Sequence, residues 1–488
     1  MRSAALRAGL TPTAVLLGGT LVLGALAEIV LLARDSRMAY LLLALLAIAV
    51  GVLLVADHVF EVFVVWVALE GIAFPFVRYP YHSAPYFTLD RYLLIVLAGA
   101  LVLQTARARM SRPTRQLAVA LGLFAAAYGL RAVTTDQLIL PVGMTPVSSL
   151  QPIADWLDGV LLPFLVFLVA ARTVTPRRWP AVAKALTVAG VSLGVFALVE
   201  TAVGFDIAGL TGVDPFRDGA AGVIRHGGPF PQPTALGSVM VICMAGTLYW
   251  LQTERAYLLG GLALGIEILG LVPGFTKTVW AAAFVVLLLG FGVRRRVSSR
   301  TALIAIYSVT TVAVVYLFVK SSPVIAARFT STESQDNFLG RLATWQQALE
   351  MFGNWPLWGV GIEQFIGGQL LVPRAAVGGV LPVPSAHNTL LSVLAEGGLL
   401  TTIPLLLVVY ASVRVVRACR KLAVTHADVV FHAVLLAALA GSVFLSMTFG
   451  EIYEPPAFIF VALLLGVAAA RVDHLRRARN GTTAGATR

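Results

Sequence analysis

Three polar residues of the sequence are of types that could act together on a phosphorylated substrate: Arg225, Arg341 and His387. The planar guanidinium of arginine donates paired, charge-assisted hydrogen bonds to phosphate oxygens, so two arginines could hold a diphosphate and stabilise it as a leaving group. A neutral imidazole, with an ordinary pKa of about 6.5, is the usual candidate for a general base at neutral pH. We therefore predict that His387 is catalytic and that both arginines bind the diphosphate.

Each of these residues also has a plain structural interpretation. Arg341 could anchor a helix to lipid phosphate, His387 could cap a helix at a membrane interface, and Arg225 could belong to a solvated linker. The combination of the three favours a site more than any one of them does. No Asp-x-Asp sequence occurs, and no acidic or His cluster of the predicted outer loops has metal-ligand spacing, so we predict neither a metal nor another cofactor.

The composition places these residues in a membrane protein. Of 488 residues, 58% are hydrophobic and 12% are charged, which is well outside the range of ordinary soluble domains. Apolar runs of roughly 20 residues, long enough to cross a bilayer, recur through most of the chain. Because backbone polar groups inside a bilayer must bond to one another, such runs form helices. We predict an all-α, polytopic membrane protein with about 12–14 transmembrane helices and a large outer loop containing an amphipathic helix.

The net charge of +12 fits this class better than a nucleic-acid-binding protein, because the basic residues form short clusters between apolar runs. By the positive-inside rule, the clusters at 107–115, 294–300, 414–421 and 476–479 mark the cytoplasmic side. Both long polar loops, with the three residues above, then fall on the outer side. The two cysteines, Cys243 and Cys419, give no disulfide or metal framework.

The apolar runs divide the chain into predicted spans. The turn near Asp57 is the open point, since two runs meet there with almost nothing polar between them and could form one broken helix. The spans begin near Thr13, Ala39, His58, Arg91, Gln116, Ile153, Pro180, Thr234, Ala256, Thr276, Thr301, Asn388, Val429 and Pro456. The predicted regions are N-terminal transmembrane helices (1–201), an outer, periplasmic loop (202–233), central transmembrane helices (234–319), a large outer loop (320–386), C-terminal transmembrane helices (387–471) and a basic cytoplasmic tail (472–488).

The two outer loops differ in their patterns. The first is rich in glycine and proline, so no regular element is expected over most of it. The second contains a predicted amphipathic helix over 338–352, which would lie on the membrane surface or cap the bundle. Arg341 lies at the edge of its apolar stripe, and Gln346, Gln347 and Glu350 lie on the other face. The stripe consists of Phe338, Leu342, Trp345, Leu349 and Phe352.

Five carboxylates fall within the predicted spans, and ionisable groups inside a membrane are functional candidates by default. They could line a groove for lipid or glycan, pair with one another, or serve a transporter. These residues are Glu28, Glu61, Glu70, Glu200 and Glu267.

Two blocks of the sequence resemble bacterial O-antigen ligases and O-antigen polymerases, which are multi-span enzymes acting on undecaprenyl-diphosphate-linked glycans. The blocks are GRLATWQQALEMFGNWPLWGVGIEQF with HNTLLSVLAEGGLL, and RHGGPFPQPTALG, within a resemblance that covers roughly residues 204–407. The pattern is Gly-Arg, Trp, Pro-x-x-Gly-x-Gly, His-Asn and Glu-x-Gly, preceded by Arg-x-x-Gly-x-Phe. It falls on Gly340, Arg341, Trp345, Pro356, Gly359, Gly361, His387, Asn388, Glu396 and Gly398, and on Arg225, Gly228 and Phe230.

The resemblance implies a metal-independent, inverting transfer of a glycan from a polyprenyl (undecaprenyl) diphosphate carrier to an acceptor hydroxyl. It places this reaction at the outer face of the bacterial cytoplasmic (inner) membrane, in the synthesis of lipopolysaccharide or another cell-surface polysaccharide. The implied partners are the lipid-linked glycan donor, a lipid-anchored or glycan acceptor and membrane lipids. Further candidates for substrate contacts are His226, Lys277, Asn388 and Glu396.

The chain also departs from the family pattern at two places. Pro233 is followed by Thr234 where the family often has asparagine, and Thr276-Lys277 stands where it often has Ser-Arg. Lys277 keeps the charge but loses the paired hydrogen bonds of a guanidinium, which weakens the case for a role there.

Other functions remain compatible with the sequence. A multi-span transporter or flippase of lipid-linked saccharides would use the buried carboxylates, although no inverted repeat is evident. A polymerase of peptidoglycan also uses lipid diphosphates and many spans. An O-antigen ligase and a polymerase differ only in the acceptor, and the sequence does not distinguish them.

Overall fold

The computed structural model describes residues 47–72, 88–105, 110–135, 151–204, 217–218, 223–224, 226–230, 232–274, 276–292, 333–372, 385–448 and 455–485. These residues are helical apart from turns, short connections and one pair of two-residue strands. The strands β1 (Arg217–Asp218) and β2 (Val223–Ile224) pair antiparallel within the first predicted loop. The predicted all-α membrane fold is confirmed.

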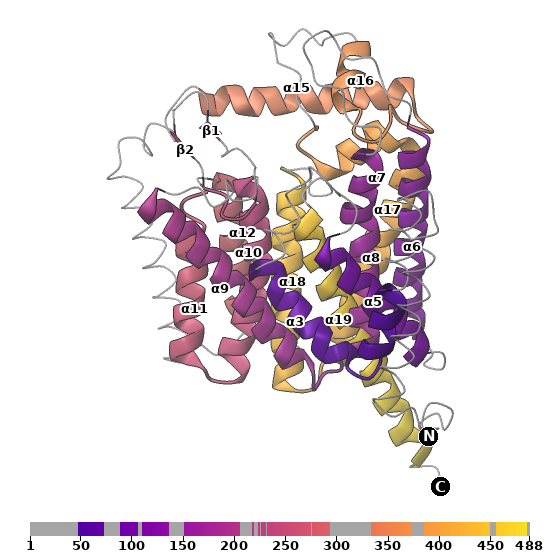
Figure 1. The fold of residues 1–488 in the computed structure, drawn as a ribbon, viewed down its shortest axis with the longest axis vertical. Helices are drawn as coiled ribbons and strands as arrows, with labels where there is room; N and C mark the ends of the chain where they lie inside the picture. Colours follow the sequence, from indigo (N-terminus) through magenta and orange to yellow (C-terminus); the bar gives the residue numbers. More distant parts are fainter. Residues whose placement is uncertain are drawn as a thin grey trace, which may run out of the picture.

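Most helices stand side by side in a bundle, and α15 (Glu333–Asn354) lies across one end of it, beside α16 (Phe365–Leu371) (Figure 1). A π-helical turn, η1, joins α7 to α8 without a break. The elements of the bundle are α3 (Val59–Ile72), α5 (Leu89–Thr105), α6 (Arg112–Val133), α7 (Gln151–Trp156), η1 (Leu157–Leu161), α8 (Leu162–Thr173), α9 (Trp179–Val203), α10 (Pro233–Thr253), α11 (Tyr257–Gly270), α12 (Lys277–Gly292), α17 (Thr389–Leu422), α18 (His426–Ser446) and α19 (Pro455–Gly485).

In the described part of the chain, 7 helices are long and apolar enough to cross a membrane, or up to 8 when a bent pair is included. The bent pair consists of the helices Ala47–Val55 and Val59–Ile72, and the bend between them is 114°. The two apolar runs near Asp57 therefore meet at a sharp break. Tyr257–Gly270 and Lys277–Phe291 are shorter apolar helices. The predicted spans near Thr13 and Thr301 lie outside the described residues.

α10 is the central helix of the bundle, and nearly every one of its residues is buried. It packs against α9, α11, α12, α18 and α19. Small residues allow this close contact: a Cβ on Gly246 would lie 2.6 Å from the carbonyl oxygen of Ala183 in α9. A helix apolar on all sides and buried at the centre is what the run beginning near Thr234 predicts.

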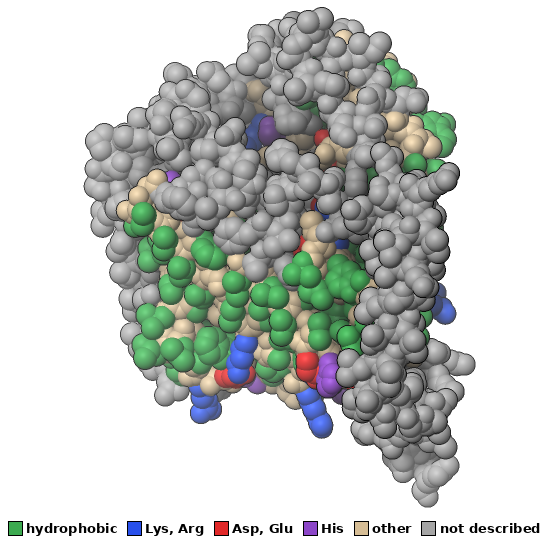
Figure 2. Space-filling view, in the orientation of Figure 1, with side chains coloured by type: hydrophobic (Ala, Val, Ile, Leu, Met, Phe, Trp, Pro, Cys, Tyr) green, Lys and Arg blue, Asp and Glu red, His purple; other side chains and the backbone are tan. Residues whose placement is uncertain are grey.

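The end of the bundle remote from α15 is basic. It carries Arg414, Arg417, Arg420 and Lys421 in the last turns of α17, and Arg476 to Arg479 in α19. Figure 2 shows basic side chains at this end and an apolar band between it and the end that α15 covers. The separation is the one that the positive-inside rule predicts for an outer α15. The predicted tail continues α19 as a helix as far as Gly485.

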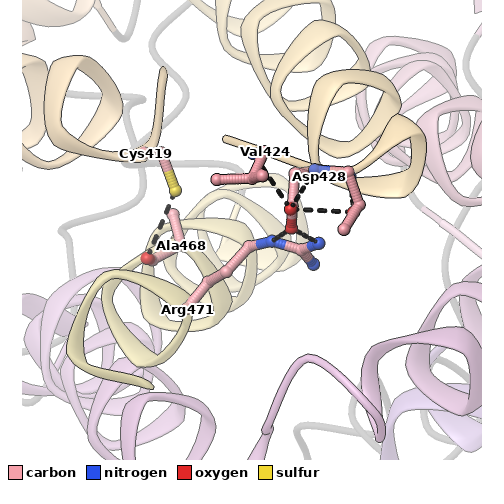
Figure 3. Close-up of polar contacts among 6 residues, drawn as sticks. Cys419, Val424, Asp428, Ala468 and Arg471 are labelled. Carbon is pink, nitrogen blue, oxygen red and sulfur yellow. Dashed lines mark hydrogen bonds and ion pairs between the residues drawn. The ribbon is translucent and has the colours of Figure 1, made fainter. Parts of the chain in front are cut away.

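A buried ion pair fastens α18 to α19 near this basic end (Figure 3). Arg471 donates to Asp428 Oδ1 from Nε, at 3.0 Å, and from Nη2. Asp428 Oδ2 accepts from the backbone N–H groups of Val424, at 3.2 Å, and Thr425, at 2.9 Å. Cys419 Sγ donates to the carbonyl oxygen of Ala468 at 3.5 Å, which links α17 to α19. Three helices are therefore held together at one point.

A second apolar cluster, separate from the bundle core, lies beneath α15. We call residues 333–372 and 385–397 the cap, since this cluster joins α15, α16 and the first turns of α17. The cluster consists of Ala348, Met351, Val360, Phe365, Val372, Ala386 and Ala395, with Trp345, Trp355 and Leu391 packed against it.

α15 includes the predicted amphipathic helix and extends it at both ends. The side packed against the protein carries Ala348 and Gln347, whose side-chain oxygen accepts from Gln369 Nε2 of α16 at 2.8 Å. Leu342 and Leu349 of the apolar stripe are 42% and 52% exposed. The periodicity predicted the helix correctly but not how its faces pack, because Trp345 of the stripe packs against the cap cluster and Gln347 of the polar face is buried.

Candidate active site

His387 lies just before α17, where the cap meets the bundle. Asn388 is the N-cap residue of α17, and its Oδ1 accepts from Leu391 N–H at 3.1 Å. Ser385 Oγ accepts from His387 N–H at 3.3 Å, and His387 has φ +49°, a left-handed conformation uncommon outside glycine. These contacts place His387 at the positive end of the α17 dipole, where a bound anion is stabilised.

Arg341 of α15 acts electrostatically on His387. Both side chains are half-buried. Burial lowers the pKa of the His387 imidazole, and the positive charge of Arg341 lowers that pKa further. Burial also lowers the pKa of Arg341, but a guanidinium stays charged in proteins. The pair therefore keeps the imidazole neutral, which is the state in which it can accept a proton.

The connection from α15 to α16, residues 355–364, docks against a break in α17. Gly398 has φ 58° and ψ −157°, so α17 is helical on both sides of an unwound residue. Val360 N–H donates to the carbonyl oxygen of Ala395 and Gly361 N–H to that of Glu396, both at 2.9 Å. Leu399 N–H donates in turn to the carbonyl oxygen of Pro356 at 2.8 Å. These bonds satisfy backbone groups that the break leaves without helical partners.

Close contact between the two backbones explains the glycines of the Pro-x-x-Gly-x-Gly and Glu-x-Gly patterns. Gly359 has φ 67°, and a Cβ there would collide with the backbone of Glu396. A Cβ on Gly398 would lie 2.6 Å from the carbonyl group of Leu357. Only glycine fits such an approach. These positions are therefore explained by packing of the cap rather than by substrate contact.

Three side chains that the sequence patterns did not single out also fasten residues 355–364. Arg131, at the end of α6, donates from Nε to the carbonyl oxygen of Trp358 at 2.8 Å. Thr135 Oγ1 accepts from Ile362 N–H at 3.1 Å. The carboxyl groups of Glu363 and Asp155 of α7 interact electrostatically, and burial raises the pKa of Glu363. The sequence could have pointed to Arg131, because it is an arginine about one turn before the end of an apolar run.

Glu396, a predicted substrate contact, is fully buried. Its Oε2 accepts from the backbone N–H of Glu363 at 3.3 Å, so it also holds residues 355–364. Eight residues separate it from Asn388, which is about 12 Å along a helix axis. The structure thus gives Glu396 a role in the cap and gives Asn388 a role as N-cap, while substrate contacts for both stay predictions.

The second group of predicted residues lies before α10. His226 N–H donates to the carbonyl oxygen of Pro273, in the turn between α11 and α12, at 3.3 Å. His226 Nδ1 lies 3.6 Å from Glu200 Oε2 of α9, and Gly228 N–H donates to the same oxygen at 2.9 Å. Lys277 begins α12 four residues after Pro273. The segments of His226 and Lys277 therefore adjoin.

The structure brings the predicted site residues to one end of the protein in two groups, Arg341 with His387 and His226 with Lys277. Both groups lie at the end of the bundle that α15 covers (Figure 1). Figure 2 shows a recess at this end in which basic and His side chains are visible. Arg225 lies outside the described residues, so its convergence with Arg341 and His387 stays a prediction.

The predicted intramembrane carboxylates have different environments. Glu28 lies outside the described residues, and Glu61 is exposed in the first turn of α3. Glu70, Glu200 and Glu267 are all buried. Of these three, Glu200 contacts a predicted site segment.

The fold defines a multi-pass membrane protein with a basic polar site under a helical cap. Comparison with known proteins agrees with this class. The model of the O-antigen ligase family matches residues 239–406, from α10 through the cap to α17. No curated protein matches the chain. The matched segment includes Arg341, His387 and Glu396, while Arg225 and His226 precede it.

Proposed function

We propose that the protein is a membrane glycosyltransferase that moves a glycan from a polyprenyl diphosphate carrier to an acceptor hydroxyl. The observation that carries the proposal is the position of His387 beside Arg341, at the start of α17 and inside the segment that matches the O-antigen ligase family. A base next to a site for a diphosphate is what transfer from such a carrier requires.

In the transfer step, the acceptor hydroxyl gives its proton to the His387 imidazole while its oxygen bonds to the anomeric carbon of the donor. The bond between that carbon and the diphosphate oxygen breaks, and its electron pair leaves with the diphosphate. Attack opposite the leaving group inverts the anomeric configuration. The proton then passes from the imidazolium to water or to the departing diphosphate, which restores the base.

Arg341 serves this step in two ways. Its charge keeps His387 unprotonated before the substrates bind, and its guanidinium can donate paired hydrogen bonds to the diphosphate. A bound diphosphate offsets part of the charge of Arg341, so the basicity of His387 rises when the donor is in place. The dipole of α17 favours the same anion.

The remaining predicted residues complete the donor site. Arg225, His226 and Lys277 supply further positive or hydrogen-bonding groups, and their nitrogen donors suit phosphate oxygens without a divalent cation. The concentration of basic residues at the opposite end of the bundle supports an outward-facing site in the cytoplasmic membrane.

The direct test is reconstitution. Purified protein in liposomes receives an undecaprenyl-diphosphate-linked glycan and an acceptor, and the glycan product and released undecaprenyl diphosphate are measured. We expect one carrier diphosphate to be released per glycan transferred. Exchange of the lipid-linked saccharide between leaflets with no glycan product would instead establish the flippase function and overturn the proposal.

A cell experiment separates ligase from polymerase. Deletion of the gene is followed by analysis of the glycans on the lipid carrier. Long polymer that stays on the carrier identifies a ligase, whereas single repeat units identify a polymerase.

A further inference from the structure

We propose that Glu200 is a positioning residue of the donor site: its carboxylate fixes the segment 226–230, which directly follows Arg225 in the chain. The inference rests on the proposed function. Glu200 lies in the last turn of α9 and acts through the residues of segment 226–230 rather than by touching the substrate.

The geometry around Glu200 joins one oxygen to two residues of the segment. Glu200 is 2% exposed. Its Oε2 accepts from Gly228 N–H at 2.9 Å and lies 3.6 Å from His226 Nδ1. Burying a carboxylate is costly unless hydrogen bonds and an opposite charge compensate it. The free energy of the buried carboxylate is therefore lowest when the segment stays in this place.

The rest of the segment folds tightly around this anchor. Gly228 has φ 57°, which glycine adopts without strain. Phe230 N–H donates to the carbonyl oxygen of Gly227 at 3.1 Å, and the Phe230 ring is 1% exposed. His226 is held on its other side by the carbonyl oxygen of Pro273. The segment thus contacts α9 through Glu200 and the turn that precedes Lys277 through Pro273.

The contact with His226 is electrostatic in nature. Glu200 Oε2 lies 3.6 Å from His226 Nδ1, which is beyond hydrogen-bond distance. The hydrogen bond from Gly228 N–H is therefore the contact that fixes the position of the segment, and the nearby carboxylate favours the place of the imidazole without bonding to it.

Glu267 is a matched control within the same bundle. It is also fully buried, in α11, but it accepts a hydrogen bond from Thr247 Oγ1 of α10 at 2.8 Å rather than from a loop. Methionine has a side chain of similar length to glutamate, so replacing either residue by methionine removes the buried carboxylate without leaving a large cavity. Only the change at Glu200 releases a segment of the donor site.

The experiment measures kcat and KM for the donor and for the acceptor in the reconstituted transfer assay, with Tm in detergent as a check on folding. Glu200→Met is expected to raise the donor KM about 10- to 100-fold, because small displacements of binding groups have effects of this size, and to leave the acceptor KM within about twofold. Glu200→Gln keeps an oxygen for Gly228 N–H and is expected to recover most of the affinity. Glu267→Met is expected to behave like the wild type.

Several outcomes would overturn the inference. These are an unchanged donor KM in Glu200→Met, equal rises in the donor and acceptor KM, equal effects of Glu200→Met and Glu200→Gln, or the same donor effect in Glu267→Met. If Glu200→Met does not fold, the test uses Glu200→Gln, His226→Gln and their double variant. The inference predicts that the effects of the two substitutions on the donor KM are non-additive in the double variant. Additive effects would refute the coupling between Glu200 and His226. No transfer by the wild type would refute the proposed function itself, whereas wild-type transfer with an unaffected Glu200→Met refutes only the role of Glu200.

Discussion

Two buried or half-buried pairs of ionisable groups lie at opposite ends of this protein. At the basic end, Asp428 and Arg471 carry opposite charges, and their side chains are 6% and 5% exposed. At the cap end, Arg341 and His387 are both bases, and the charge of one opposes protonation of the other. The first pair is electrostatically complete as it stands, whereas the second becomes more favourable when an anion joins it.

The comparison shows that burial of charge alone does not mark a functional site. Opposite charges that bond to each other join helices and need a partner only from the protein. Arg341 and His387 cannot neutralise each other, and a substrate of negative charge would interact favourably with the guanidinium of Arg341. Substitutions at the cap end should therefore reduce transfer, whereas substitutions at the basic end should reduce stability.

His387→Asn is expected to reduce kcat for glycan transfer about 10²- to 10⁴-fold, the range for loss of a general base. Asparagine tolerates the left-handed φ of +49° at this position better than alanine does, so the loss is not a folding defect. His474→Asn makes the same change at an exposed position of α19 and should leave transfer unchanged. Normal transfer by well-folded His387→Asn would remove His387 from the mechanism.

Arg341→Gln tests the electrostatic effect of Arg341 on His387 through the pH dependence of kcat/KM. The charge of Arg341 lowers the pKa of His387, so its removal should raise that pKa toward the ordinary value. Because transfer needs neutral His387, activity falls as the pH drops through this pKa, and the acid limb of the variant should lie at higher pH. An acid limb at the wild-type pH would contradict the electrostatic role.

Arg341→Lys separates the two roles of that arginine. Lysine keeps the positive charge but cannot form the paired hydrogen bonds of the guanidinium. The acid limb is therefore expected near its wild-type position while the donor KM rises about tenfold, equivalent to ~1.4 kcal/mol of binding free energy. A donor KM equal to that of the wild type would show that Arg341 acts by charge alone.

Gly359→Ala tests whether the docking of residues 355–364 supports the site. A Cβ at this position meets the Glu396 backbone, and φ is 67°, so the cap must shift and transfer should fall about 10- to 100-fold. Gly353→Ala is the matched control, since a Cβ there meets no atom within 4 Å. Equal transfer by both variants would show that the cap geometry does not matter for the reaction.

Arg471→Met is expected to have the smallest effect on transfer and a clear effect on stability. It leaves Asp428 buried without its opposite charge, which costs about 3–5 kcal/mol, so Tm in detergent should fall. The double variant Asp428→Asn/Arg471→Met should recover part of that loss, and kcat per folded molecule should stay unchanged. A lowered kcat in folded Arg471→Met would mean that this ion pair contributes to the reaction after all.

The helical membrane fold and the helix over 338–352 could be predicted from the sequence alone, whereas the chemistry assigned to the candidate site stays a prediction. Hydrophobic runs in a bilayer can only be helices, since each backbone polar group must bond within its own segment. The apolar stripe of α15 repeats at helical spacing, and that spacing is local. The family resemblance likewise depended on residue types at fixed positions, and residues 239–406 match the O-antigen ligase family.

Which groups meet depends on the tertiary structure. The structure shows that Gln347 bonds to α16 and that Asn388 caps α17. It also shows that Arg131, Thr135 and Glu396 hold the cap. It also joined Glu200 to a segment 26–28 residues further along the chain. Periodicity and motif spacing describe neighbours along the chain, whereas these contacts depend on how separate helices pack, and no local pattern encodes which helices do so.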